Sequence, residues 1–358
     1  MKKNTRIFWV LCLNIFLLQI LVEARTLRRI DVKKFETKYS LFLEASYYDL
    51  DEQENEYFFD GAGAELKFES ANLNGIIAIN YKDSRDTFFN DNQIFLNKFA
   101  AELPFNGFAV AVGKMDNMSM PRNYNYFDRM ILTRSFIDNS IFKNNPFGAQ
   151  LYTLNSDFFY AIGIFAAPKF TTAPIFETRT NRISSLALNY EDYDSKKIET
   201  FASIGISSEE TGLFMKVGLS KSAITDEELD NLKIMSADNS LTGHSKKMWY
   251  AAISQKYQAM DFFGGYYKFD ISNFENILYD VLLSYQIEKN FNLCAGYNKS
   301  KIKNVTTANK LFANNTQYIA GINYDFSGMT IGYEYLNHKN SFDSQKLSNH
   351  IFKVLFVF

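Results

Sequence analysis

The chain has 358 residues, a formal net charge of −2 and two cysteines, Cys12 and Cys294. The near balance of charge excludes a strongly basic protein that binds nucleic acid through its overall charge. Two cysteines exclude a small scaffold held together by several disulfides. Aromatic residues make up 16 % of the chain, and beyond the N-terminal segment they occur without long apolar runs, which indicates fine mixing of apolar and polar positions.

The first 24 residues have the order of a secretory signal peptide. Lys2, Lys3 and Arg6 precede an apolar run over 7–22, and small or β-branched residues stand at Val22-Glu23-Ala24. This order predicts cleavage after Ala24; the alternative, a retained membrane anchor, would need about 20 apolar residues. We therefore expect a signal peptide over 1–24 and one exported domain over 25–358. Cys294 alone cannot form an internal disulfide there, which favours a bacterial envelope protein.

Segments of alternating apolar and polar residues recur along the exported domain. In KYSLFLEASYY (38–48), Tyr39, Leu41, Leu43, Ala45 and Tyr47 fall on one face. GAGAELKFES (61–70) and ILYDVLLSYQIE (277–288) follow the same pattern. Period-2 alternation is typical of β-strands. Turn-like sequences join several of these segments: NLNG (72–75), PFNG (104–107), IEKN (287–290) and DFSG (325–328).

Short turns alternate with longer polar connections, and the apolar faces are rich in aromatic residues. This combination predicts an all-β fold, a transmembrane antiparallel β-barrel, because a closed sheet satisfies every backbone polar group within the membrane. The last segment, SNHIFKVLFVF (348–358), would pair with the first strand near Tyr39 to close the barrel. Its apolar face would meet lipid: Phe352, Val354, Phe356 and Phe358. An exported soluble β-sandwich is the alternative, with the same faces buried between two sheets.

The number of strands is ambiguous at one place. Bacterial single-chain barrels have an even number of strands, whereas the alternating runs give an odd number. Short turns and long connections alternate correctly up to about residue 167 and again from about residue 200, so the error lies between them. We expect sixteen strands, with eighteen as the alternative.

The connection over 116–146 is much longer than the others. A long loop of this kind is usually functional, and a sixteen- to eighteen-stranded barrel leaves an aqueous lumen that such a loop could narrow. Opposed charges at the narrowing would select polar solutes over lipophilic ones. The candidate constriction residues are Arg122, Asp128, Arg129, Arg134 and Asp138 on the loop, and Lys67, Lys114 and Lys216 on the wall.

The whole exported domain resembles the general bacterial porins of Gram-negative outer membranes. The resemblance rests on the signal peptide, the strand array, Gly113-Lys114 at the end of the fifth run, LYTLNSDFFYAIGIF (151–165) and the terminal Phe358. It implies that the long loop folds into the lumen and that Phe358, with Phe356 before it, is read by the barrel assembly machinery. It also implies a homotrimer in the outer membrane, in contact with lipid and lipopolysaccharide.

These observations predict a porin, a water-filled channel for passive diffusion of ions and small hydrophilic solutes, with no enzymatic activity, metal or cofactor. Two other classes remain open. A surface adhesin or structural barrel would need elaborated external loops. A barrel hydrolase would need a nucleophile and a base at the rim, and the histidines available are His244, His338 and His350, the first two expected in loops.

Overall fold

The chain is represented by a computed structural model. It describes residues 36–50, 56–70, 72–82, 93–121, 130, 145–154, 157–168, 175–177, 182–184, 193–224, 226, 229–230, 233, 242–243, 245–271, 274–303, 314–340 and 346–358. The expected signal peptide over 1–24 lies outside the described residues. Within them, no helix is long and apolar enough to cross a membrane.

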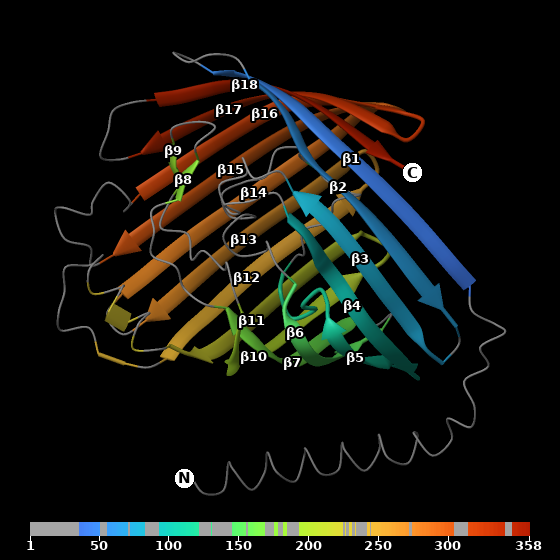
Figure 1. The fold of residues 1–358 in the computed structure, drawn as a ribbon, viewed down its shortest axis with the longest axis vertical. Coiled ribbons are helices and arrows are strands. Elements are labelled where there is room, and N and C mark those ends of the chain that lie inside the picture. Colours follow the sequence, from blue (N-terminus) through green and yellow to red (C-terminus); the bar gives the residue numbers. More distant parts are fainter. Residues whose placement is uncertain are drawn as a thin grey trace, which may run out of the picture.

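In the described part of the chain, sixteen antiparallel strands close into one barrel. Figure 1 shows them running obliquely across the wall, with β1 beside β18. The first half of the barrel consists of β1 (Glu36–Leu50), β2 (Glu56–Glu69), β3 (Asn74–Lys82), β4 (Gln93–Phe105), β5 (Phe108–Lys114), β6 (Phe147–Thr153), β7 (Phe158–Pro168) and β10 (Tyr193–Ser208). The second half consists of β11 (Leu213–Ala223), β12 (Ser245–Tyr257), β13 (Met260–Ile271), β14 (Phe274–Glu288), β15 (Phe291–Lys303), β16 (Asn314–Phe326), β17 (Met329–Asn340) and β18 (Lys346–Val357).

Two further strands explain the ambiguity in strand number. β8 (Ile175–Glu177) and β9 (Arg182–Ser184) pair only with each other, in a small sheet separate from the barrel. β7 pairs directly with β10, for example Gly163 with Phe201. The expected sixteen strands are therefore confirmed, and the segment between 167 and 200 contributes strand structure without contributing to the barrel wall.

Short turns join the strands at one end of the barrel. They include 72–73, 106–107, 258–259, 289–290 and 327–328, so all four turns predicted from the sequence are confirmed. Ser327 and Gly328 both have positive φ, 42° and 90°, as a two-residue hairpin turn requires for the twist of its strands. The connections at the other end are longer, apart from 272–273, and this end is called the loop end below.

The barrel closes at the pairing of β1 with β18, which we call the seam. Leu43 lies opposite Phe356, and Ala45 opposite Val354. The terminal residue takes part directly, since Phe358 N donates to Leu41 O at 2.9 Å and Leu41 N donates to Phe358 O at 2.8 Å. The expected closure by the last strand is thus confirmed, and it leaves no sheet edge unpaired among the barrel strands.

The two faces of the wall differ as the alternation predicts. Along β1, Tyr39, Leu41 and Leu43 are exposed whereas Phe42 and Glu44 are buried. The exposed set around the barrel is apolar, which makes it the outer surface. The opposite positions face the interior, called the lumen, and include many buried polar residues: Glu44, Ser46, Glu65, Asn80, Lys197, Glu199, Ser203, Lys216, Ser220, Lys246, Asp280, Asn298, Glu334 and Lys353.

The inner face also carries apolar residues, which the sequence did not predict. One cluster combines Phe263, Leu282, Ile319, Leu336 and Ile351, and Met130 of the long loop packs against it. The inner wall is therefore not polar throughout. In this sector it is apolar, and Met130 of the long loop packs against it.

Candidate functional site

The start of the long loop, residues 115–121, lies against the inner wall. Met115 and Met120 are buried in an apolar cluster with Phe165, Phe201 and Tyr250, which come from β7, β10 and β12. Small residues make room for this packing: Ala109, Ala111 and Ala161 on the inner face of β5 and β7 are almost fully buried. Large side chains at these positions would fill the space that the loop occupies.

Lys216 of β11 holds the loop from one side. Its ammonium group donates to the carbonyl oxygens of Met118 at 2.5 Å and Met120 at 2.8 Å, and it lies 4.2 Å from the centre of the Phe159 ring. Tyr250 of β12 adds a hydrogen bond from its hydroxyl to the carbonyl of Ser119. Backbone carbonyl groups of an irregular segment have no partners in a helix or sheet, so they need such donors when they are buried.

Gln150 of β6 holds the same segment from the other side. Its Nε2 donates to the carbonyl of Asp116 at 2.9 Å, and its Oε1 accepts from the backbone N–H of Met118 at 2.9 Å. Because β6 and β11 are three strands apart in the barrel order, the loop start runs along the wall between them. It is bonded on both sides, which fixes its position in the lumen.

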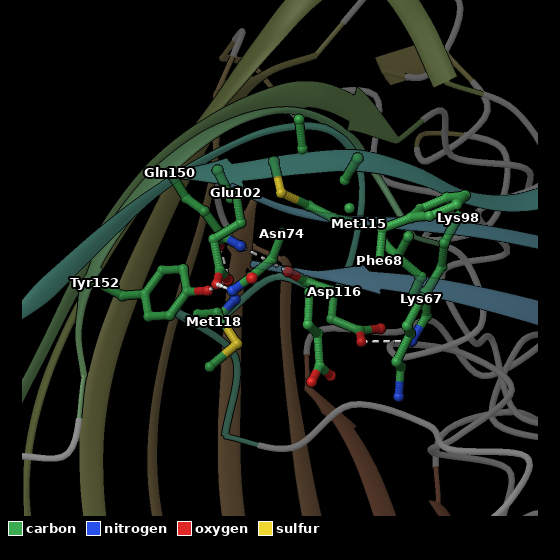
Figure 2. Close-up of a pocket in the computed structure, with 16 residues that line it drawn as sticks. Lys67, Phe68, Asn74, Lys98, Glu102, Met115, Asp116, Met118, Gln150 and Tyr152 are labelled. Atoms are coloured by element: carbon green, nitrogen blue, oxygen red, sulfur yellow. Dashed lines mark hydrogen bonds and ion pairs between the residues drawn. The ribbon is translucent and has the colours of Figure 1, made fainter. Parts of the chain in front are cut away.

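A cavity of about 310 Å³ lies between the loop start and the inner wall of β2 to β6. Figure 2 shows its two ends: Glu102, Gln150 and Tyr152 gather around Asn74, whereas Lys67 and Lys98 lie near Asp116. At the first end, Glu102 accepts hydrogen bonds from Asn74 Nδ2 at 2.8 Å and from the Tyr152 hydroxyl.

The second end carries a chain of alternating charges, which we call the charge ladder: Lys67, Glu65, Lys98 and Asp116. Lys67 pairs with Glu65 at 2.9 Å, Glu65 lies 3.9 Å from Lys98, and Lys98 pairs with Asp116 at 2.5 Å. The Lys67 side chain remains 49 % exposed. Opposed charges beside a water-accessible cavity create a local field that acts on passing ions and dipoles.

The structure separates the three wall lysines that the sequence analysis grouped together. Lys67 faces the lumen and is exposed there, whereas Lys216 faces the lumen but is only 5 % exposed beneath the loop. Lys114 lies opposite Phe99 and Phe147, both about half exposed on the outer surface. The expectation that Lys114 lines the lumen is therefore wrong: the small Ala109 and Ala111 take the inner face of β5, and alternation along the strand places Lys114 outside.

The loop residues proposed for the constriction, Arg122, Asp128, Arg129, Arg134 and Asp138, lie outside the described residues. Only 116–121, 130 and 145–146 of the expected inward loop are described, and the first part contacts the inner wall. Inward folding of the entire segment stays a prediction.

Several members of the site were not predicted. Lys98 was not predicted because a register shift opposite Ala78 interrupts the alternation of β4. Beyond that shift, counting alternate positions from the start of the strand no longer gives the face on which a residue lies. The position of the loop start decides which contacts three further residues make. Asp116 pairs with Lys98, Gln150 bonds the backbone of Asp116 and Met118, and Tyr250 bonds Ser119. The inward alanines at 109, 111 and 161 were the available signal, since small residues on one face mark a close approach.

The histidines are placed as follows. His338 belongs to β17, so its expected position in a loop is wrong, and His244 lies outside the described residues. His350 lies near the start of β18, with Nδ1 2.6 Å from the Tyr333 hydroxyl. Among the described residues, no group of three or more His, Cys, Asp or Glu side chains could hold a metal ion.

No family model matches the sequence, and no protein of curated function matches it. Solved structures do share its fold. An anion-selective porin from Comamonas acidovorans superposes with a TM-score of 0.59 at 10 % identity, over 91 % of this chain and 100 % of its own. The outer membrane channel DcaP of Acinetobacter baumannii gives 0.58 at 11 % identity, over 92 % and 99 %. OmpT of Vibrio cholerae in a trimer form gives 0.57 at 10 % identity, over 90 % and 99 %. The chain therefore has the fold of outer-membrane porins.

Proposed function

We propose that the protein is an outer-membrane porin that lets ions and small hydrophilic solutes diffuse passively through its lumen. The observation that carries this proposal is the contrast between the two faces of one closed sheet. The outside is apolar, whereas the inside bears the partly exposed charge ladder beside a cavity. A barrel of this strand number is wide enough to hold an aqueous channel.

The proposal includes a constriction at the long loop. The loop start is fixed beside the charge ladder, and the proposal places the rest of the segment in the lumen as well. Arg122, Asp128, Arg129, Arg134 and Asp138 would then add charges opposite Lys67. Such charges would order water and favour polar solutes.

The proposed route to the membrane uses both ends of the chain. Residues 1–24 would direct export, and Phe356 and Phe358 would be recognised by the barrel assembly machinery. The mature protein would form a homotrimer, which the trimer form of OmpT from Vibrio cholerae, a structure of the same fold, supports.

Reconstitution into planar lipid bilayers tests the channel. Purified, folded protein should raise the ionic current in discrete steps, and trimers should give steps that close in thirds. Bilayers that stay silent after verified insertion of folded barrels would reject the channel and leave a structural or adhesive role. Chemical cross-linking of the same preparation tests the trimer separately.

A further inference from the structure

Glu102 of β4 forms one end of the cavity beneath the loop start, which we call the acidic end. Asn74 of β3 donates to one carboxylate oxygen through Nδ2 at 2.8 Å, and the hydroxyl of Tyr152 on β6 donates to the other oxygen. Figure 2 shows these three side chains meeting at the acidic end. Both donors are uncharged, so they orient the carboxylate without neutralising it.

The other charges around the cavity are balanced by their neighbours. The two lysines and two carboxylates of the charge ladder have formal charges that cancel. Glu69, which also lines the cavity, pairs with Lys38 at 2.7 Å. In the described part of the chain, no cationic side chain forms an ion pair with Glu102. The cavity therefore has an excess of one formal negative charge, which is located at Glu102.

Apolar side chains line the cavity between its two ends. Ile76, Ala100 and Ala111 come from the wall, and Met115 and Met118 come from the loop start. The volume of about 310 Å³ falls at the lower end of the about 300–1,000 Å³ that is usual for small-molecule sites. Methionine side chains adapt to the shape of a ligand and make favourable contacts with aromatic rings. These surfaces suit an apolar or aromatic body, whereas a calcium ion would need about six oxygen ligands.

We propose that this cavity binds small organic ammonium compounds with an apolar or aromatic body, the ammonium group at Glu102 and the body between Ile76 and the two methionines. An ammonium group supplies three donors, and the Glu102 carboxylate has acceptor sites beyond the two that Asn74 and Tyr152 use. Charge-assisted hydrogen bonds of this kind are about twice as strong as neutral ones. As a statement about which solutes the lumen retains, the proposal rests on the proposed function and deepens it.

Isothermal titration calorimetry of the folded protein in detergent with phenethylammonium chloride measures this binding without requiring a channel. Glu102→Gln keeps the size of the side chain and an acceptor oxygen but removes the charge, so it should weaken binding at least about tenfold. Glu69→Gln is the matched control, because Glu69 lines the same cavity but is paired with Lys38. A paired and partly exposed charge contributes little, so the control should change the affinity less than about twofold.

Two analogues identify the recognised group. Phenylethanol has the same ring without a charge, and phenylacetate carries the opposite charge. The wild type should bind both at least about tenfold more weakly than phenethylammonium. The site would be overturned by equal binding of phenylethanol, by an unchanged affinity in Glu102→Gln, by equal weakening in Glu69→Gln, or by a wild type that does not bind phenethylammonium.

Planar bilayers separate the site from the channel. Phenethylammonium should reduce the current through the wild type more than the current through Glu102→Gln. Bilayers that are silent before the compound is added would reject the porin function and leave the calorimetric result in place. Conducting bilayers together with calorimetry that detects no binding would reject the site and leave the porin function in place.

Discussion

Lys67 and Lys216 have the same charge and face the same lumen, but their surroundings give them different roles. Lys67 is exposed beside the cavity and has Glu65 as its partner, so its charge reaches the solution. Lys216 lies under the loop and donates to two carbonyl oxygens, so its charge serves to hold the loop. A sequence pattern that counts both as wall cations misses this difference.

The difference predicts two separable phenotypes. Lys67→Gln should shift the reversal potential toward cation preference, because it removes an exposed positive charge from the lumen. Lys216→Met should leave the reversal potential almost unchanged but increase current noise, because it removes the bonds that fix residues 118–120. It should also lower the free energy of unfolding by about 2 kcal/mol. Single-channel recording in a salt gradient measures both effects, and a larger selectivity shift for Lys216→Met than for Lys67→Gln would contradict the assignment.

A second residue pair acts at the seam. Lys353 of β18 bonds Glu44 of β1 at 3.0 Å, and both side chains are only 6 % exposed. Lys353→Met leaves a buried carboxylate without this cation, so the barrel should lose about 3 kcal/mol of stability. Adding Glu44→Gln should restore part of the loss. Lys256→Met is the control, since Lys256 is 77 % exposed and lies 3.4 Å from Asp261; it should cost less than about 1 kcal/mol. Urea unfolding followed by tryptophan fluorescence measures all three.

At the scale of elements, the position of the loop start depends on a site where β11 has no side chain and a ring from β12 fills the space. Gly218 of β11 lies directly opposite Tyr250 of β12, and a Cβ on Gly218 would overlap the Tyr250 ring. The ring therefore occupies the place of a side chain on β11. From there its hydroxyl reaches Ser119 of the loop. The glycine is thus needed for space, not for backbone flexibility.

Gly218→Ala should consequently displace Tyr250 and loosen the loop without opening the barrel. We expect increased open-channel noise and a loss of about 1–3 kcal/mol, the usual cost of an overpacked site. Gly264→Ala is a suitable control, because the nearest side-chain atom to its new Cβ would be Phe262 Cζ at 3.3 Å. If Tyr250→Phe gives the same noise as Gly218→Ala, the lost hydrogen bond to Ser119 accounts for the effect. Unaltered noise in both variants would show that Tyr250 does not restrain the loop.

The sequence predicted elements best where strand and turn chemistry agree. Ser327-Gly328 and Asn106-Gly107 mark turns that form as expected, and the alternation of β1 assigns its outer face correctly. β5 could not be oriented because Ala109 to Val112 are apolar on both faces. The site itself was only partly predictable: the inward position of Lys216 follows from alternation, whereas its carbonyl partners depend on how a distant segment folds back. The β8–β9 hairpin likewise has strand-like sequence but no place in the wall.

At the scale of the whole molecule, every function proposed above depends on closure of the sheet. In the closed barrel Ala45 of β1 and Val354 of β18 are direct neighbours, and Ile331 of β17 lies one strand further on, opposite Val354. Cross-strand neighbours have Cα atoms about 4.5–5.5 Å apart, within the about 4.4–6.8 Å that a disulfide spans. Two strands away the separation is about 10 Å, which is too far.

With Cys12 and Cys294 replaced by Ser, the pair Ala45→Cys and Val354→Cys should therefore form a disulfide on mild oxidation. The pair Ala45→Cys and Ile331→Cys should not. Closing the seam covalently joins strands at the two ends of the chain, so the oxidised protein should migrate as a compact species in a denaturing gel and expand only on reduction. An open sheet or a sandwich would keep residues 45 and 354 apart and give no cross-link in either pair. Oxidation of the first pair alone would establish that β1 and β18 are direct neighbours and that the sheet is closed.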